Sequence, residues 1–287
     1  MKILPGSLRL LFTFKGSLLK KLTKGMLVIT AITTGLCYLE LEGHIRIFHL
    51  SNALPGYMGA ALGLLLVFRN NTAYDKWWEA RKELGALVNV SRNMAISING
   101  LLPSGHHEKT RMANLLITFV YTMKSHLGKG VTETDFKELG AEDHNIVSQA
   151  SHKPVVVANI MMSRIEWLWK EKIISEMQQY LLMTKIDLMV DVLGKCERIK
   201  NTPIPMAYSF LLKFFIILYV MILPFGLLDE LGWWSIPLVI ILYYILMSIV
   251  LTAEEIEEPF GKDLNDLPFD QMAENIKNNV HEIVKQD

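Results

Sequence analysis

The sequence predicts an all-α protein with four membrane-spanning helices and a large helical region between the second and the third. Two observations support this prediction. Apolar residues gather in stretches long enough to enter a bilayer, while most charged residues lie between those stretches. Between the stretches, apolar side chains recur every three or four residues, as on amphipathic helices. The composition alone is less informative, because 51% hydrophobic residues and a mean hydropathy of +0.27 are near those of soluble domains.

The two clearest spans lie late in the chain, at 206–228 and 232–252. Each is close to the roughly 20 apolar residues that a helix needs to cross a bilayer. Residues 229–231 join them, so we expect a tight transmembrane hairpin. Lys213 is the only charged residue in the first of these spans, and it lies near enough to one end to reach the membrane surface.

Two earlier spans are predicted at 25–42 and 53–68. The second is short for a lipid-facing helix and is rich in small residues, which let helices approach closely within a membrane bundle. We therefore expect it to lie inside a protein assembly. Its small residues are Gly56, Gly59, Ala60, Ala61 and Gly63.

Positive charges indicate the orientation of these spans. Residues 1–24 contain six lysines and arginines and are predicted to form an amphipathic segment at the cytoplasmic surface. The connection 43–52 contains one arginine, and 229–231 contains none. With four spans, the region 69–205 and the C-terminal arm 253–287 then face the cytoplasm as well.

The region 69–205 is predicted to be helical. Apolar faces with helical spacing occur at 79–101, 111–127 and 157–198, and the last reads as one long amphipathic run. Thr132-x-x-Asp135 resembles a capping box at the start of a shorter helix. The predicted face residues are Leu84, Leu87, Val88, Ser91, Met94, Ala95 and Ile98; then Leu115, Leu116, Phe119 and Met123; then Ile165, Leu168, Ile173, Met177, Leu181, Leu188 and Val192.

Several classes of function find no support in the sequence. The signatures H-E-x-x-H, G-x-S-x-G and G-x-x-x-x-G-K-[ST] are absent, so no enzyme is predicted. A net charge of zero gives no reason to expect nucleic-acid binding. Cys37 and Cys196 are expected to be unpaired thiols. His106 and His107 precede Glu108 in a loop, but no further ligand at metal-site spacing accompanies them, so no metal site is expected.

Three blocks of sequence are more informative about function than these single motifs. Phe68-Arg69-Asn70 leads to Trp77-Trp78-Glu79, Cys196-Glu197-Arg198-Ile199 precedes Thr202-Pro203-Ile204-Pro205, and Ile256-Glu257-Glu258-Pro259-Phe260-Gly261 precedes Asn265-Asp266-Leu267-Pro268. In this order and with these spans between them, the blocks resemble the prokaryotic branch of the bestrophin family. The resemblance covers roughly residues 10–275.

The resemblance implies a homopentameric ion channel of the bacterial inner membrane, shaped as a funnel or barrel around one central pore. It implies an apolar neck at Ala60, Leu64 and Phe68, whose i, i+4, i+8 spacing independently places them on one helix face. It also implies a cytoplasmic constriction at Met177, a position that could equally fill a helical core. The expected partners are identical subunits, the lipid bilayer and permeant inorganic ions.

Calcium-binding bestrophins have a continuous acidic run where this sequence has Asp263 and Asp266. Lys262 and Leu264 interrupt that run here. Calcium takes six to eight oxygen ligands, so we expect no cofactor and favour a structural turn over a calcium site.

The permeant ion is predicted to be a monovalent cation, with an anion as the alternative. The cation prediction depends on Leu64, where vertebrate anion-conducting members have an aromatic residue, and on the acidic block Glu254, Glu255, Glu257 and Glu258. A secondary transporter or a membrane scaffold is a weaker alternative, since no internal repeat is visible.

Overall fold

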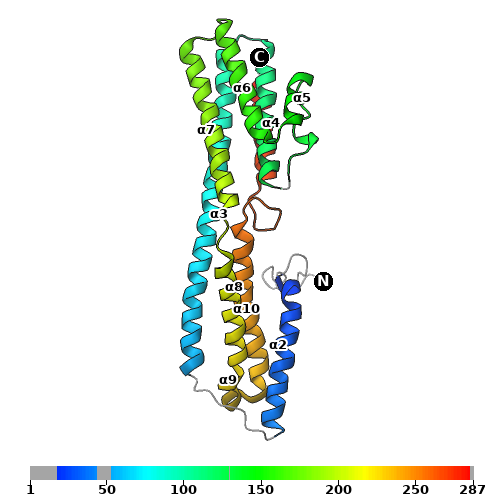
Figure 1. Cartoon of the computed structure of the whole chain (residues 1–287), viewed down its shortest axis with the longest axis vertical. Coiled ribbons are helices and arrows are strands. Elements are labelled where there is room, and N and C mark those ends of the chain that lie inside the picture. Colours follow the sequence, from blue (N-terminus) through cyan, green and yellow to red (C-terminus); the bar gives the residue numbers. More distant parts are fainter. Residues whose placement is uncertain (1–17, 44–52, 129, 285–287) are drawn as a thin grey trace, which may run out of the picture. The chain divides into compact units, whose positions relative to one another are not determined.

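The computed structural model describes residues 18–43, 53–128 and 130–284, and every regular element in these ranges is helical (Figure 1). The predicted fold class is therefore confirmed. The chain divides into two compact units. The first comprises 1–75 and 203–257, and the second comprises 76–202 and 258–287. Most of the predicted N-terminal amphipathic segment lies outside the described residues.

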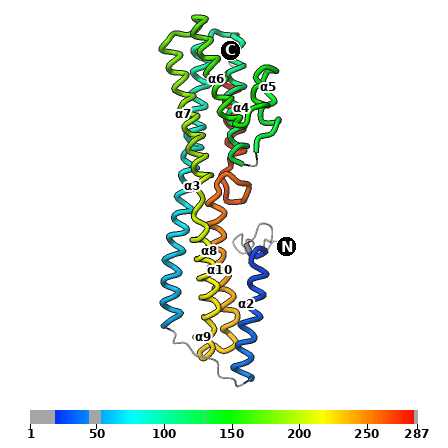
Figure 2. The backbone as a smooth tube through the Cα atoms, in the orientation of Figure 1, coloured from blue at the N-terminus to red at the C-terminus, as the bar shows by residue number. Residues whose placement is uncertain are grey.

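The first unit is a bundle of long apolar helices (Figure 2). Its helices are α2 (Leu18–Leu41), the first part of α3 (Ala53–Leu101), α8 (Met206–Ile222), α9 (Pro224–Leu231) and α10 (Ser235–Glu257), with a short 3₁₀ turn η2 (Gly232–Trp234) before α10. Helix α10 packs against α2, α8 and α9. Gly25 lets α2 approach α10, because a Cβ there would lie 2.1 Å from the hydroxyl of Tyr243.

Two helical stretches of the described chain are long and apolar enough to cross a membrane, at 19–41 and 206–257. Only 22% of each apolar window is buried within the chain. The core helix of a soluble protein would be mostly buried, so this pattern fits helices whose outer faces meet lipid or other protein.

The helix boundaries differ from the predicted spans. Helix α2 begins at Leu18, seven residues before the predicted span. Helix α8 ends at Ile222, because Pro224 cannot donate a backbone hydrogen bond and instead begins α9. The predicted span 53–68 and the amphipathic face 79–101 belong to one continuous helix of 49 residues, α3.

The second unit is a helical bundle with its own core. It contains the later part of α3, α4 (His107–Leu127), the 3₁₀ turn η1 (Glu133–Asp135), α5 (Ala141–Gln149), α6 (Lys153–Lys170), α7 (Glu176–Asn201) and α11 (Phe269–Val284). The predicted faces at 79–101 and 111–127 are confirmed. Every residue of both faces is buried except Val88, which is half-buried. The capping box is also present, since the Thr132 N–H donates to Asp135 Oδ2 at 2.8 Å.

The prediction of one amphipathic run over 157–198 is wrong. Helix α6 ends at Lys170, Lys172 adopts a left-handed backbone conformation (φ 59°), and Ser175 caps α7 through a capping box with Gln178. Because of the break, the positions of α7 that face the core differ from those that one continuous helix would give. In α7 the predicted face residues Leu181 and Leu188 are exposed, whereas Val192 is buried as predicted. The buried residues of α7 are Leu182, Ile186, Met189, Val192, Leu193, Cys196 and Ile199.

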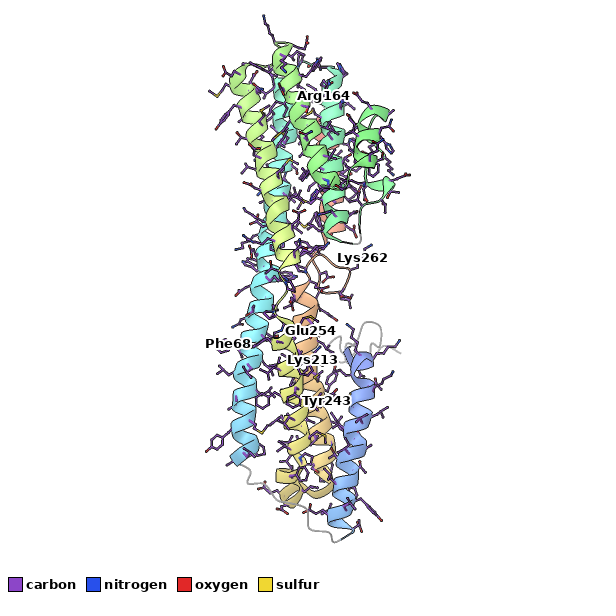
Figure 3. The ribbon with its side chains drawn as sticks, viewed as in Figure 1. Phe68, Arg164, Lys213, Tyr243, Glu254 and Lys262 are labelled. Carbon is purple, nitrogen blue, oxygen red and sulfur yellow. The ribbon has the colours of Figure 1, made fainter. Side chains whose placement is uncertain are left out.

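A buried carboxylate joins two helices of the second unit. Glu108 is fully buried and accepts hydrogen bonds from both Nε and Nη2 of Arg164, with Nε 3.2 Å from Oε2. Arg111 lies 4.0 Å from the same carboxylate and also binds Asp143 at 2.6 Å. The hydrogen bonds that Arg111 donates to the Asp143 carboxylate raise the pKa of Arg111 above its usual value. Figure 3 shows Arg164 on α6 in this unit.

We predict that Glu108→Ala lowers the free energy of unfolding by about 3–5 kcal/mol, because it leaves the Arg164 guanidinium without its buried partner, whereas Arg111 keeps Asp143. Glu142→Ala is the matched control. Glu142 also pairs with Arg111, at 3.3 Å, but its side chain is 78% exposed, so we expect a loss of at most about 1 kcal/mol. Denaturant unfolding of the detergent-solubilised protein measures both. Equal losses would show that burial of the Glu108 pair contributes nothing beyond a surface contact.

Candidate functional site

An uncovered apolar face on α3 is the first candidate site. The three predicted neck residues lie on this face, at successive turns of the helix. Leu64 is 58% and Phe68 57% exposed, and Ala60 is exposed as well, whereas Leu62 and Leu66 face the bundle and are buried. Figure 3 shows Phe68 on the side of α3 turned away from α8 and α10. The structure therefore brings the three residues together on one outward face.

A buried salt bridge lies directly beneath this face. The Arg69 side chain is fully buried, and its Nη2 donates to Glu257 Oε2 at 2.5 Å. The other oxygen of Glu257 accepts the backbone N–H of Ile204 at 2.7 Å. Arg69, Ile204 and Glu257 come from the three separate sequence blocks, so those blocks meet at one point in the first unit.

The acidic block at the end of α10 is paired with cations. Glu254 binds Lys213 at 2.6 Å (Figure 3). Glu255 binds Lys21 at 2.8 Å. With the Arg69–Glu257 pair, three of the four carboxylates that suggested cation selectivity are neutralised within the chain. Lys213, the charge inside a predicted span, thus has a defined partner.

The loop after α10 is held by its own hydrogen bonds. Asp266 Oδ2 accepts the backbone N–H of Asp263 at 2.5 Å, and the Asn265 carbonyl accepts the indole N–H of Trp77 at 3.0 Å. A Cβ at Gly261 would lie 2.5 Å from Asp266 Oδ2, so a side chain there would displace the Asp266 carboxylate. These contacts show that Asp266 closes a turn. Whether Asp263 and Asp266 bind calcium, as the resemblance could imply, stays untested.

Met177 lies in the first turn of α7 and is 75% exposed. The alternative that it fills a helical core is therefore wrong. Tyr180 and Leu181 beside it are also exposed, so this end of α7 presents an apolar surface. Its role as a constriction stays a prediction.

The structure also assembles a cluster that the sequence did not reveal. His126 Nε2 and His152 Nε2 lie 2.7 and 2.8 Å from the same oxygen of Glu197. The two histidines are 26 residues apart, and Glu197 follows His152 by 45 residues and His126 by 71, so no local spacing connects them. Only the position of Glu197 within a family block gave a signal.

Neither cysteine of the chain forms a disulfide, as predicted, and both are buried. Burial raises the pKa of the Cys196 thiol from 9.0 to about 12, and the nearby carboxylates of Glu83 and Glu197 add to the shift. The folded protein thus holds this proton more tightly than the unfolded chain. The resulting contribution to stability is complete below pH 9 and is lost as the pH rises from about 9 to about 12.

We predict that Cys196 resists alkylation at pH 8 in a Cys37→Ala background, because the thiolate is the reactive form. Maleimide labelling followed by mass spectrometry should show slow modification of the native protein and fast modification after denaturation. The control adds Lys195→Cys to the same background, where the side chain is 49% exposed and the new thiol should react quickly. Equal native rates for the two thiols would refute the burial of Cys196.

A family model described as "Bacterial/Fungal Bestrophin protein" matches residues 2–282. Among solved structures, a bacterial bestrophin homolog from Klebsiella pneumoniae is 27% identical with a TM-score of 0.84, and the match covers 94% of this chain and 100% of that one. A structure titled only as a membrane protein has a TM-score of 0.85 at 26% identity and covers 92% of this chain and 100% of that one.

Curated relatives share a common description. A "Voltage-dependent anion channel-forming protein" from Synechocystis sp. is 31% identical over 281 residues, covering 96% of this chain and 91% of the relative. One from Nostoc sp. is 35% identical, covering 77% and 74%. The relative YneE from Escherichia coli bears the same description at 31% identity, covering 94% and 89%. These findings confirm that the chain is not an enzyme.

Proposed function

The chain belongs to the bacterial/fungal bestrophin family, and on that premise we propose that it forms an ion channel in the bacterial inner membrane from identical subunits. The uncovered apolar face of α3 carries this proposal. An exposed apolar face on a long helix is expected to contact lipid or a neighbouring subunit, or to line a pore that excludes water.

The proposed pore is a homopentamer with α3 nearest the axis. Five copies would then place Ala60, Leu64 and Phe68 in three stacked apolar rings. Ala60 is small, so the ring that it forms is the widest of the three. Rings of larger apolar side chains can hold a pore closed by excluding water. The N- and C-termini are proposed to face the cytoplasm, with spans near 25–42, 53–68, 206–228 and 232–252.

We propose that anions are the permeant ions. The printed descriptions of the curated relatives name anion channels. The pairing of Glu254, Glu255 and Glu257 with cations removes the main argument for an acidic ring. A monovalent cation is the second candidate, supported by Leu64, which is aliphatic at the predicted neck. A turnover-limited transporter is a third candidate.

Reversal potentials of the purified protein in planar bilayers test the permeant ion. With a tenfold KCl gradient, an anion-selective channel reverses with the concentrated side positive, approaching about 59 mV, the Nernst value for a single charge. A cation-selective channel reverses with the opposite sign. Discrete single-channel steps are expected in either case. A flux that saturates without such steps would refute the channel and favour a transporter.

We predict that Leu64→Ala and Phe68→Ala raise the single-channel current, because each enlarges an apolar ring and weakens dewetting. Ile241→Ala is the matched control. Ile241 is 54% exposed, about as much as Leu64 and Phe68, but it belongs to α10 and not to α3. If all three variants conduct like the parent, α3 does not form the neck in this way.

A further inference from the structure

We propose that His126, His152 and Glu197 form a binding site for a divalent transition metal of the zinc class. His126 lies in the last turn of α4, His152 immediately precedes α6, and Glu197 lies near the end of α7. One oxygen of Glu197 faces the Nε2 atoms of both histidines, at 2.7 and 2.8 Å. Two imidazoles and a carboxylate from three elements thus converge on one point.

The geometry is close to that of a metal site. The three ligand atoms all lie within 4.8 Å of one another. Tetrahedral zinc with bonds of about 2.0–2.1 Å separates its ligand atoms by about 3.3 Å. The present contacts therefore need to widen by only about half an ångström to admit the ion. Each of the three side chains is between a quarter and two-fifths exposed, so water can complete the coordination.

The donor set indicates the class of metal. Two histidines with one glutamate and a water bind zinc in known proteins, and imidazole also suits cobalt, nickel and copper. Calcium and magnesium prefer sets made only of oxygen atoms. Cys196 adjoins Glu197 in sequence, but its side chain packs in the core of the second unit, and its sulfur is not one of the converging ligand atoms.

A second group of histidines and a glutamate, at the other end of α4, shows why this cluster differs from an ordinary surface group. His106, His107 and Glu108 are consecutive, yet Glu108 already binds Arg164 and Arg111. At the proposed site, no arginine or lysine ion pair with Glu197 occurs within the described part of the chain, and its two recorded partners are imidazoles. His152 Nδ1 is buried and has no hydrogen-bond partner among the described residues. A metal would give this ring a coordinating role through Nε2.

Metal binding would connect the ends of α4 and α7 to the start of α6 within the second unit. The proposal depends on local geometry and not on the permeant ion, so it can fail while the channel function holds. Because a metal binds the neutral imidazole, protons compete with the metal for the same nitrogen atoms, and affinity should be lower in acid.

The test is calorimetric titration of the chelator-treated, full-length protein with ZnCl₂. We expect one ion per chain. His126→Gln, His152→Gln and Glu197→Gln should each weaken binding at least about tenfold, since losing even an outer-shell partner of a metal costs 10–100-fold. His107→Gln is the matched control, because it removes an imidazole from the other histidine pair and should bind zinc like the parent.

A second measurement uses the unaltered protein, so its outcome does not depend on whether the variants fold. Zinc-edge X-ray absorption should show two imidazole nitrogens at about 2.0–2.1 Å. Absence of stoichiometric zinc binding, or a spectrum with oxygen ligands only, would overturn the proposal. It would also be overturned if the three ligand variants retained parental affinity. None of these outcomes affects the channel measurements.

Discussion

The buried guanidinium of Arg69 is the constraint on which the first unit depends. A cation without access to water requires a partner, since an unpaired buried charge is among the costliest defects in a protein. Glu257 provides that partner, and the same carboxylate also accepts the Ile204 N–H. Helix α3, the segment before α8 and the end of α10 are thereby tied together. Because Arg69 must point inward, the neighbouring turns of α3 are rotated so that Leu64 and Phe68 point outward.

The same logic explains the acidic block at the end of α10. In the sequence this block reads as a solvated turn or as a negative ring. In the structure, Glu254 and Glu255 pair with Lys213 of α8 and Lys21 of α2. An ionisable residue inside a membrane span is costly and is usually paired. The acidic block therefore supplies counter-charges for cations on the helices that α10 contacts.

The sequence predicted those parts of the fold that depend on local periodicity. The face of α4 repeats every three or four residues without interruption, and all four of its predicted core positions are buried. Apolar spacing alone does not reveal the break after α6, because the spacing continues through Ile173. The signal that could have revealed the break was Ser175-x-x-Gln178, a capping box inside the supposed helix.

Contacts between distant segments could not be predicted in the same way. His126, His152 and Glu197 meet only because α4, α6 and α7 pack together, and no sequence spacing encodes that meeting. The partners of Arg69 were equally hidden, although each lies in a block that suggested the family. Such blocks mark where the chain converges, but they do not specify which atoms pair.

Phe68 is exposed on α3, whereas Arg69 next to it is buried, so the proposed neck is apolar and excludes this charge. From Ala60 to Phe68 the face extends about 12 Å along the helix and carries no charge. Apolar rings of this kind respond to hydration and diameter, and they distinguish weakly between ions of opposite sign. The nearest cation, Arg69, is buried and neutralised by Glu257. In the proposed pore, the choice between anions and cations would therefore arise from groups beyond the neck, and the neck would control whether ions pass.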